Sequence, residues 1–372
     1  MEIGKVSGNV LKRSVLGQIH TRREEVISGA GIGADCAIFS CADGEKLVTC
    51  MQEAAVSRAV CEMGCGESVI PVEKTGRMEA GVPAKELECM AFGMSAKEPY
   101  MTLAQLIQKC ANNIAVCGAE PVAVMLTLLL PENTEERDIK ALLSEAEQKC
   151  GELSIMLMGG QTRITGQVTV PWAVAAGYGR AEAEENHSVK TAAPGQDIVL
   201  SKWIGLQGTA VLAKRNQEKL TEKLPSYLVE EAAGFDRYLS IIPEAAAAVK
   251  SGVCAMHDAS EGGIFAALWE LAEGAGVGLH IDMRKLPLRQ ETVEVCEYCN
   301  ANPYELLSGG CLLMTAVDGQ RLAEALTAER IPAVVVGRIV EGKGRILQNG
   351  EEIRYLDRPK QDQVYKAQQY NA

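Results

Sequence analysis

Hydrophobic and polar positions along the chain predict strands and helices that alternate through its second half. Short apolar runs predict strands over 36–39, 121–130, 154–158, 168–178, 197–201, 253–256, 279–283, 311–317 and 333–336, and a hairpin over 345–355 that turns at Asn349-Gly350. Apolar residues at helical spacing predict helices over 102–116, 135–150, after Gly208, and over 228–238, 243–250, 262–275 and 319–329. Asn133 or Thr134 is the expected N-cap of the helix over 135–150.

A polar stretch over 181–195 is expected to separate two domains. It contains Glu, His, Lys and Pro, which are typical of a linker or an exposed turn. We therefore expect an N-terminal domain over 1–180, a C-terminal domain over 181–356 and a polar tail over 357–372. The first domain contains an irregular insertion at about 53–98, and the sequence does not indicate what its least regular part, Cys61–Lys85, does.

Composition and charge narrow the classes of partner. The chain has 372 residues with 47% hydrophobic and 23% charged side chains, which excludes disorder as its main state. Its net charge of −12 argues against a nucleic-acid partner. The longest apolar run, Val122–Leu130, is shorter than the ~18 residues of a membrane helix, and Met1–Lys5 lacks a secretory core. We expect a cytoplasmic protein with no membrane partner.

Thirteen cysteines, an odd number, are expected to be reduced thiols. The pairs Cys61/Cys65 and Cys296/Cys299 lack a second pair at zinc-ribbon spacing, so structural zinc is not expected. The sequence does not indicate whether any cysteine is functional.

Two glycine-rich segments are candidates for binding phosphate. Gly29–Asp35 is followed by a strand rather than a helix, which does not fit a dinucleotide fingerprint, but its N–H groups could approach phosphates and Asp35 could bind Mg²⁺. Gly159-Gly160-Gln161-Thr162 follows a predicted strand and could expose its backbone to a ligand. The alternatives are a flexible turn for the first segment and a tight turn for the second.

Other polar positions also have two interpretations. Asn112 and Asn113 lie inside a predicted helix although Asn is a poor helix former, which suggests a ligand, with exposed polar positions as the alternative. His257–Gly263 precedes a helix that Asp258 or Ser260 could cap, and the free N–H groups there could bind an anion. The sequence contains no G-x-S-x-G, P-loop or H-E-x-x-H motif.

In their order and spacing, these motifs resemble those of the AIR synthase (PurM-like) superfamily of ATP-binding proteins. The segment Ala255–Asp258 with Gly262-Gly263 most resembles the HypE-like hydrogenase-maturation branch. The resemblance runs through 29–35, 111–121, 159–162, 194–208, 255–275 and 304–317. It implies an α+β, two-domain PurM-like fold, in which the N-terminal domain pairs with that of a second copy into an intersubunit β-barrel and the C-terminal domain is an α+β sandwich.

The resemblance also implies a reaction and a site. ATP and Mg²⁺ would bind near the interface, and the γ-phosphate would pass to an amide-type oxygen. The implied nucleotide-binding residues are Gly31, Gly33, Asp35, Asn112, Asn113, Gly159, Gly160, Gln161 and Thr162. Asp35 and Glu98 would bind the metal. The acceptor side of the cleft would be lined by Asp258, Ser260, Gly262 and Gly263.

The sequence departs from the family pattern at anionic positions. Asn113 and Gln161 stand where the family carries Asp, and the spacing of a further Asp falls near Met51 and Gln52. Because Mg²⁺ prefers anionic oxygens, we expect magnesium binding to be weak or lost. The HypE-like reaction needs a cysteine at the C-terminus, whereas the last cysteine here is Cys311, so no such acceptor is expected.

Two functions remain open from the sequence. The first is an ATP-dependent, homodimeric enzyme that activates a small-molecule or carboxamide-bearing substrate, together with a maturation partner protein. The second is a catalytically degenerate protein that binds a nucleotide or small molecule in a regulatory role. The sequence does not identify the acceptor, nor does it show whether ATP turnover survives.

Overall fold

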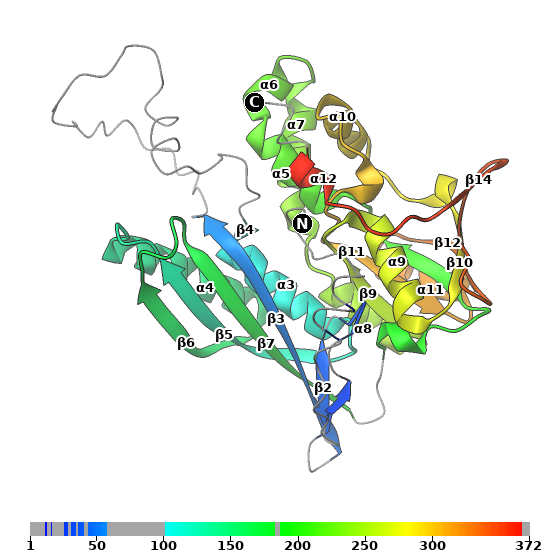
Figure 1. The fold of residues 1–372 in the computed structure, drawn as a ribbon, viewed down its shortest axis with the longest axis horizontal. Helices are drawn as coiled ribbons and strands as arrows, with labels where there is room; N and C mark the ends of the chain where they lie inside the picture. Colours follow the sequence, from blue (N-terminus) through cyan, green and yellow to red (C-terminus); the bar gives the residue numbers. More distant parts are fainter. Residues whose placement is uncertain are drawn as a thin grey trace.

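Two seven-stranded sheets organise the described part of the chain (Figure 1). The structure is a computed structural model that describes Lys12, Leu16 and residues 26–28, 31–34, 36–40, 44–57, 101–182 and 187–366. The irregular insertion expected at about 53–98 begins later than predicted, because residues 53–57 belong to a strand that ends at Ser57, and the rest of it lies outside the described residues. None of the described helices is both long and apolar enough to cross a membrane.

The first sheet has the order β1-β2-β3-β7-β5-β6, with β4 paired to β3. Its strands are β1 Val26–Ser28, β2 Ala37–Ser40, β3 Glu45–Ser57, β4 Met101–Thr102, β5 Glu120–Leu130, β6 Met156–Ile164 and β7 Trp172–Glu182. Helices α3 (Leu103–Ala115) and α4 (Glu136–Leu153) cover one face. Thr102 begins α3 through a capping box with Gln105, as the start predicted near residue 102 requires.

The second sheet has the order β14-β13-β10-β12-β8-β11-β9. Its strands are β8 Asp197–Ser201, β9 Ala255–Ala259, β10 Gly278–Asp282, β11 Cys311–Ala316, β12 Ala333–Val340, β13 Arg345–Asn349 and β14 Glu352–Tyr355. Apolar side chains on one face pack on α9 (Gly263–Ala275), and those on the other pack on α8 (Ile242–Lys250) and α11 (Gly319–Ala328). The hairpin predicted at Asn349-Gly350 joins β13 to β14.

The remaining helices are short and cluster near one end of the second sheet. They are α5 Leu206–Arg215, α6 Gln217–Thr221, α7 Ser226–Ala233, α10 Gln290–Tyr298 and α12 Gln363–Lys366, with the 3₁₀ turns η3 Val189–Thr191, η4 Gly234–Tyr238, η5 Met283–Lys285 and η6 Pro303–Glu305. Helices α5, α7 and α10 pack around buried residues that include Leu212, Val229 and Val295. Helix α10 was not predicted from the sequence.

One apolar core is shared between the two sheets. The buried side of α3, including Ile107 and Ile114, belongs to the same cluster as Met256 and Leu312 of the second sheet. Asn112 links the halves further, because its Nδ2 donates to the Leu239 carbonyl (2.7 Å) and its Oδ1 accepts from the Ile241 N–H (3.2 Å). The two sheets are therefore packed together through α3.

Several element boundaries differ from the expectations. The strand expected over 154–158 continues to Ile164, and the N-cap of α4 is Glu135. Strand β9 extends through Ala259, so His257 and Asp258 lie inside it rather than in a loop. The segment expected as a polar tail buries Asp362 (1% exposed) and Val364, because their side chains bond to or pack on the second half of the chain.

Candidate functional site

The glycine-rich turn at 31–34 lies against α9 of the second half. A Cβ at Gly33 would lie 2.8 Å from the Glu270 carbonyl oxygen, and the φ of Gly33 is +69°. A Cβ at Gly274 would likewise lie 2.8 Å from the Ile32 carbonyl oxygen. The glycines here permit close packing of backbone on backbone. Asp35, the predicted metal ligand of this turn, lies outside the described residues, as does Glu98.

Asn112 and Asn113 are both buried rather than exposed (3% and 4%). The Asn112 Oδ1 also accepts a hydrogen bond from Gln108 Nε2 (2.9 Å), so both polar atoms of this amide are used within the chain. The backbone carbonyl of Asn113 accepts from the Cys36 thiol (2.8 Å). Asn112 therefore has a structural role at the junction between the two sheets.

Gly159-Gly160-Gln161-Thr162 lies within strand β6 and is not a turn after it. The β5–β6 register shifts between Val124 and Met125, which leaves Met158 as a bulge. A Cβ at Gly160 would lie 1.8 Å from the Leu126 carbonyl oxygen. The strand continues through Gly160 because a residue without a side chain lets β6 approach β5 at this distance. The local sequence does not reveal this, because the contact is with another strand.

Asn113 and Gln161, two of the predicted nucleotide-binding residues, lie far apart within one chain. The end of α3 that carries Asn113 packs against Gly179 of β7, which pairs with Pro121 of β5. Gln161 pairs with Thr127, six residues further along β5. At ~3.3 Å per residue, this separates the two positions by about 20 Å along the strand. Gln161 and Thr162 are exposed on the edge strand of the sheet.

The predicted acceptor-side residues are divided between two environments. Asp258 is 5% exposed and pairs with Leu312, so it faces the side of the sheet covered by α8. Gly262 begins α9 in the left-handed conformation (φ +84°), and it lines a pocket on the outside of the second half. A Cβ at Gly263 would lie 2.6 Å from the Tyr304 carbonyl oxygen. The Ser260 carbonyl accepts from the N–H of Gly263 (3.1 Å).

The carboxylate of Asp362 bonds to the backbone at the start of α9, where the predicted capping side chain of Asp258 or Ser260 is not found and Gly262 is the N-cap residue. This carboxylate accepts hydrogen bonds from the N–H groups of Gly262 (2.6 Å), Leu307 (3.2 Å) and Val364 (2.8 Å). Burial raises the pKa of Asp362 to about 7, against the lowering effect of these N–H groups. No local pattern could indicate this contact, because Asp362 lies 100 residues from Gly262 in the chain.

A buried ion pair lies near the junction on the second half. Lys202 has a φ of +51°, and its Nζ donates to the carbonyl oxygens of Tyr238 (2.8 Å) and Ser240 (2.6 Å). The same Nζ lies 2.5 Å from the Glu244 Oε1. Lys202 and Asn112 therefore both bond to the backbone of the segment 238–241. Sequence reasoning missed this pair, since Lys and Glu usually indicate a surface.

The described residues do not form a metal centre by themselves. They contain no group of three or more His, Cys, Asp or Glu side chains arranged to bind a metal ion. The nine cysteines in the described segments are free thiols. Burial raises the pKa of Cys296 to about 12 and that of Cys299 to about 11, which disfavours the thiolate that a metal would need.

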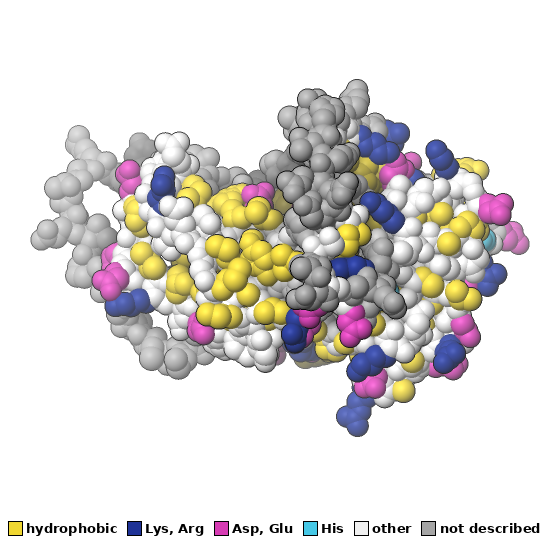
Figure 2. Space-filling view, turned by 90° about the horizontal axis from the view of Figure 1, so that it is seen from below, with side chains coloured by type: hydrophobic (Ala, Val, Ile, Leu, Met, Phe, Trp, Pro, Cys, Tyr) yellow, Lys and Arg dark blue, Asp and Glu magenta, His cyan; other side chains and the backbone are white. Residues whose placement is uncertain are grey.

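The outer face of the first sheet is apolar and exposed. Met51, Ala176 and Met125 lie in one row across β3, β7 and β5, and the two methionine side chains are exposed (69% and 38%). Further exposed apolar residues of this sheet are Ile27, Leu47, Val122, Met156, Met158 and Ile164. Figure 2 shows hydrophobic side chains gathered on this half of the molecule. Such a patch is typical of an interaction surface.

Comparisons with known proteins agree with this architecture. Residues 87–181 match the N-terminal domain, and residues 193–348 the C-terminal domain, of AIR synthase related protein. Carbamoyl dehydratase HypE of Rhodobacter capsulatus is 26% identical over 235 residues, which are 62% of this chain and 67% of the relative.

Solved structures show the same fold. A crystal structure of a HypE–HypF complex has a TM-score of 0.67 at 17% identity and covers 95% of this chain and 100% of that chain. HypE in complex with ATP has a TM-score of 0.61 at 14% identity, with 98% and 97% covered. The predicted resemblance is confirmed, and so is a fold of mixed helices and strands with two sheets. With both domains matched in order, the chain belongs to the AIR synthase-related, PurM-like family and is similar to its HypE members.

Proposed function

We propose that this protein uses ATP to activate an amide-type or carboxamide oxygen. The observation that carries the proposal is that both domains match the family and that the chain is similar to relatives named carbamoyl dehydratase. The fold is also that of a HypE structure in complex with ATP. In the proposed step, the substrate oxygen bonds to the γ-phosphorus while the bond to ADP breaks. The C–O bond then breaks and phosphate leaves, while the amide nitrogen of a primary carboxamide gives up its two protons and forms a C–N triple bond.

The working form is proposed to be a homodimer that pairs through the outer face of the first sheet. The exposed row at Met51 and Met125 supports this proposal, because burying an apolar sheet face against a second copy removes it from water and is favourable. Among the described strands, β6 pairs with β5 alone and forms one edge of that sheet. We propose that Gln161 and Thr162 on β6 complete the nucleotide site across the dimer, since they lie far from Asn113 within one chain.

Magnesium binding in this site is proposed to be weak. Asn113 and Gln161 carry amides, which are neutral ligands, and the described residues hold no acidic cluster of three. Asp35 and Glu98 remain the proposed anionic ligands, and both lie outside the described residues. We propose Gly31 and Gly33 as neighbours of the phosphates. A maturation partner is a further proposal, supported by the HypE–HypF complex among structures of the same fold.

Calorimetry on the full chain with ATP, with and without Mg²⁺, tests the proposal, together with a phosphate-release assay. We expect ATP binding that Gln161→Ala weakens about tenfold, the equivalent of ~1.4 kcal/mol. The matched control is Gln320→Ala, an exposed glutamine on α11, which should leave binding unchanged. Asp35→Asn should reduce phosphate release more than Asp258→Asn. The absence of ATP binding at millimolar concentration would refute the function.

The alternative is a nucleotide-binding protein without turnover. Three of the predicted site residues favour this alternative, namely Asn112, Gly33 and Gly160. Each has a structural role that the fold needs whether or not the protein catalyses a reaction. Tight ATP binding with no phosphate release in the presence of a range of carboxamides would select this alternative.

A further inference from the structure

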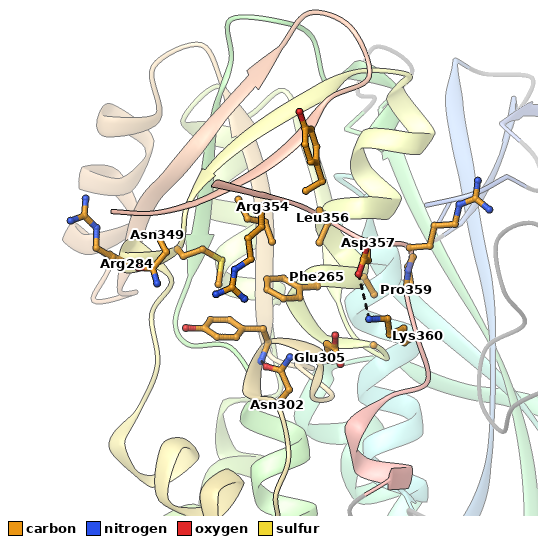
Figure 3. A pocket seen from close by; sticks show the side chains of 17 residues that line it. Phe265, Arg284, Asn302, Glu305, Asn349, Arg354, Leu356, Asp357, Pro359 and Lys360 are labelled. Carbon is orange, nitrogen blue, oxygen red and sulfur yellow. Dashed lines mark hydrogen bonds and ion pairs between the residues drawn. The ribbon is translucent and has the colours of Figure 1, made fainter. Parts of the chain in front are cut away.

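A pocket of about 540 Å³ is lined by residues of the second half of the molecule (Figure 3). It lies between the start of α9, the 3₁₀ turn η6 and the segment 354–360, which comprises the end of β14 and the residues after it. Its volume is in the range of about 300–1,000 Å³ that is usual for small-molecule sites. Gly262 is the one residue of the predicted acceptor side that lines it.

The charge of the pocket is opposite to that of the chain. Four cationic side chains line it, against two acidic ones, whereas the whole chain has a net charge of −12. The cations are Arg284, Arg354, Arg358 and Lys360. Of the acids, Glu305 accepts a hydrogen bond from Gln363 (2.7 Å) and Asp357 lies 3.4 Å from Lys360. A local excess of positive charge on an acidic protein favours an anionic ligand.

The arginines are available to such a ligand. Arg284 pairs with Asp282 and Arg354 with Glu352, but the arginine side chains are 66% and 67% exposed. Exposed pairs of this kind contribute only about 0–1 kcal/mol, so a phosphate or carboxylate can replace them. Figure 3 shows the guanidinium of Arg354 beside the ring of Phe265.

A flat aromatic surface lies in the same pocket. The rings of Phe265 and Tyr304 stack with centroids 5.2 Å apart and planes at 10°. Both side chains line the pocket, and Asn302 and Asn349 add amide groups at its rim. Stacked rings present a rigid planar surface on which a further ring can pack.

The wall of the pocket is held in place from outside. The segment 356–360 forms that wall, and just beyond it Asp362 bonds to the N–H groups of Gly262 and Leu307. Gln363 bonds to Glu305 in the opposite wall. Because these contacts fix the segment, the pocket is formed before a ligand arrives.

From this combination we propose that the pocket binds a small aromatic anion, meaning a planar ring that carries a phosphate or a carboxylate. The ring packs on an outer face of the Phe265–Tyr304 stack, and the anionic group pairs with Arg354 and its cationic neighbours. The site is separate from the ATP site proposed above and does not depend on it.

Fluorescence titration with 1-naphthyl phosphate and 1-naphthoate tests the site, with 1-naphthol and inorganic phosphate as probes of each part alone. We expect at least one naphthyl anion to bind about tenfold more tightly than either partial probe. Arg354→Ala should weaken that binding about tenfold. The matched control is Arg321→Ala, an exposed arginine on α11 that does not line the pocket, and it should have no effect. Hydrogen exchange should slow in 345–360 on binding.

Three results would overturn the proposal. The first is that neither naphthyl anion binds at millimolar concentration. The second is that Arg354→Ala and Arg321→Ala lose binding affinity equally. The third is that inorganic phosphate binds as tightly as the naphthyl anions. Each titration is repeated with saturating ATP. Retained binding supports a separate site, and displacement by ATP refutes it. If ATP itself does not bind, the proposed function fails while the naphthyl result still decides this site.

Discussion

Replacing Asp362 by Asn should change how the stability of the protein depends on pH. The Asp362 carboxyl is buried, and burial raises its pKa from the ordinary 3.8 to about 7, with the charge of Glu261 contributing in the same direction. Between these two values the folded state holds a proton that the unfolded state releases. The stabilisation from this proton is therefore complete below about pH 4 and is lost as the pH rises to about 7.

The size of the effect follows from the two pKa values. Over the whole interval from 3.8 to about 7 it amounts to about 4 kcal/mol, since one pKa unit corresponds to ~1.36 kcal/mol. From about pH 5.5 to pH 7 the part that can be measured is about 2 kcal/mol. Asp362→Asn removes the titration and keeps the shape of the side chain. Relative to this variant, the free energy of unfolding of the native protein should fall by about 2 kcal/mol as the pH rises from about 5.5 to 7.

Urea unfolding of both proteins at a series of pH values measures the effect. All other titrating groups are common to the two proteins and cancel in the difference between their free energies of unfolding. Asp357→Asn is the control, since it changes an exposed carboxyl in the same segment and should leave the wild-type slope intact. Parallel curves for the native protein and Asp362→Asn would refute the reasoning.

Two further predictions concern stability. Gly160→Ala should lower the free energy of unfolding in urea by more than ~3 kcal/mol, because its Cβ would lie 1.8 Å from the Leu126 carbonyl oxygen. The control, Gly151→Ala, has open space around it in α4 and should raise the free energy of unfolding by about 0.5–1 kcal/mol. An unchanged midpoint for Gly160→Ala would contradict the β5–β6 pairing. Lys202→Met should cost about 3–5 kcal/mol, because it leaves the Glu244 carboxylate buried without its partner. The double variant Lys202→Met with Glu244→Leu should regain part of this lost stability. A double variant as unstable as Lys202→Met alone would contradict the buried ion pair.

The sequence predicted elements well where periodicity was strong. In β5, residues Val124, Leu126, Leu128 and Leu130 alternate as buried positions beneath α3 and α4, and the apolar run indicated the strand. The start of α3 near Thr102 was likewise predicted, because apolar residues recur at helical spacing from Leu103 onward. The family resemblance was also confirmed, since it depends on the order of motifs rather than on any one of them.

Predictions were weaker where a residue's role depends on a distant partner. Two adjacent glycines at Gly159-Gly160 suggested a tight turn, but the strand continues through them, and Gly160 is needed for close contact with Leu126 of a neighbouring strand. Asp362 looked like part of a polar tail, although it bonds to a helix start 100 residues away. Asn112 looked like a ligand-binding residue, while its amide in fact joins the two sheets. Contacts of this kind leave no periodic signal in the sequence.

The shared core has a consequence for engineering. Because α3 packs between the sheets, its buried surface is completed only by residues such as Met256 and Leu312 from the other half. A fragment that ends at residue 182 would expose that apolar surface to water. It would also lose the Leu239 carbonyl and the Ile241 N–H that bond to the Asn112 amide. A chimaera that joins one half of this chain to the other half of a relative therefore needs the contacting residues of α8 and β9 exchanged as well.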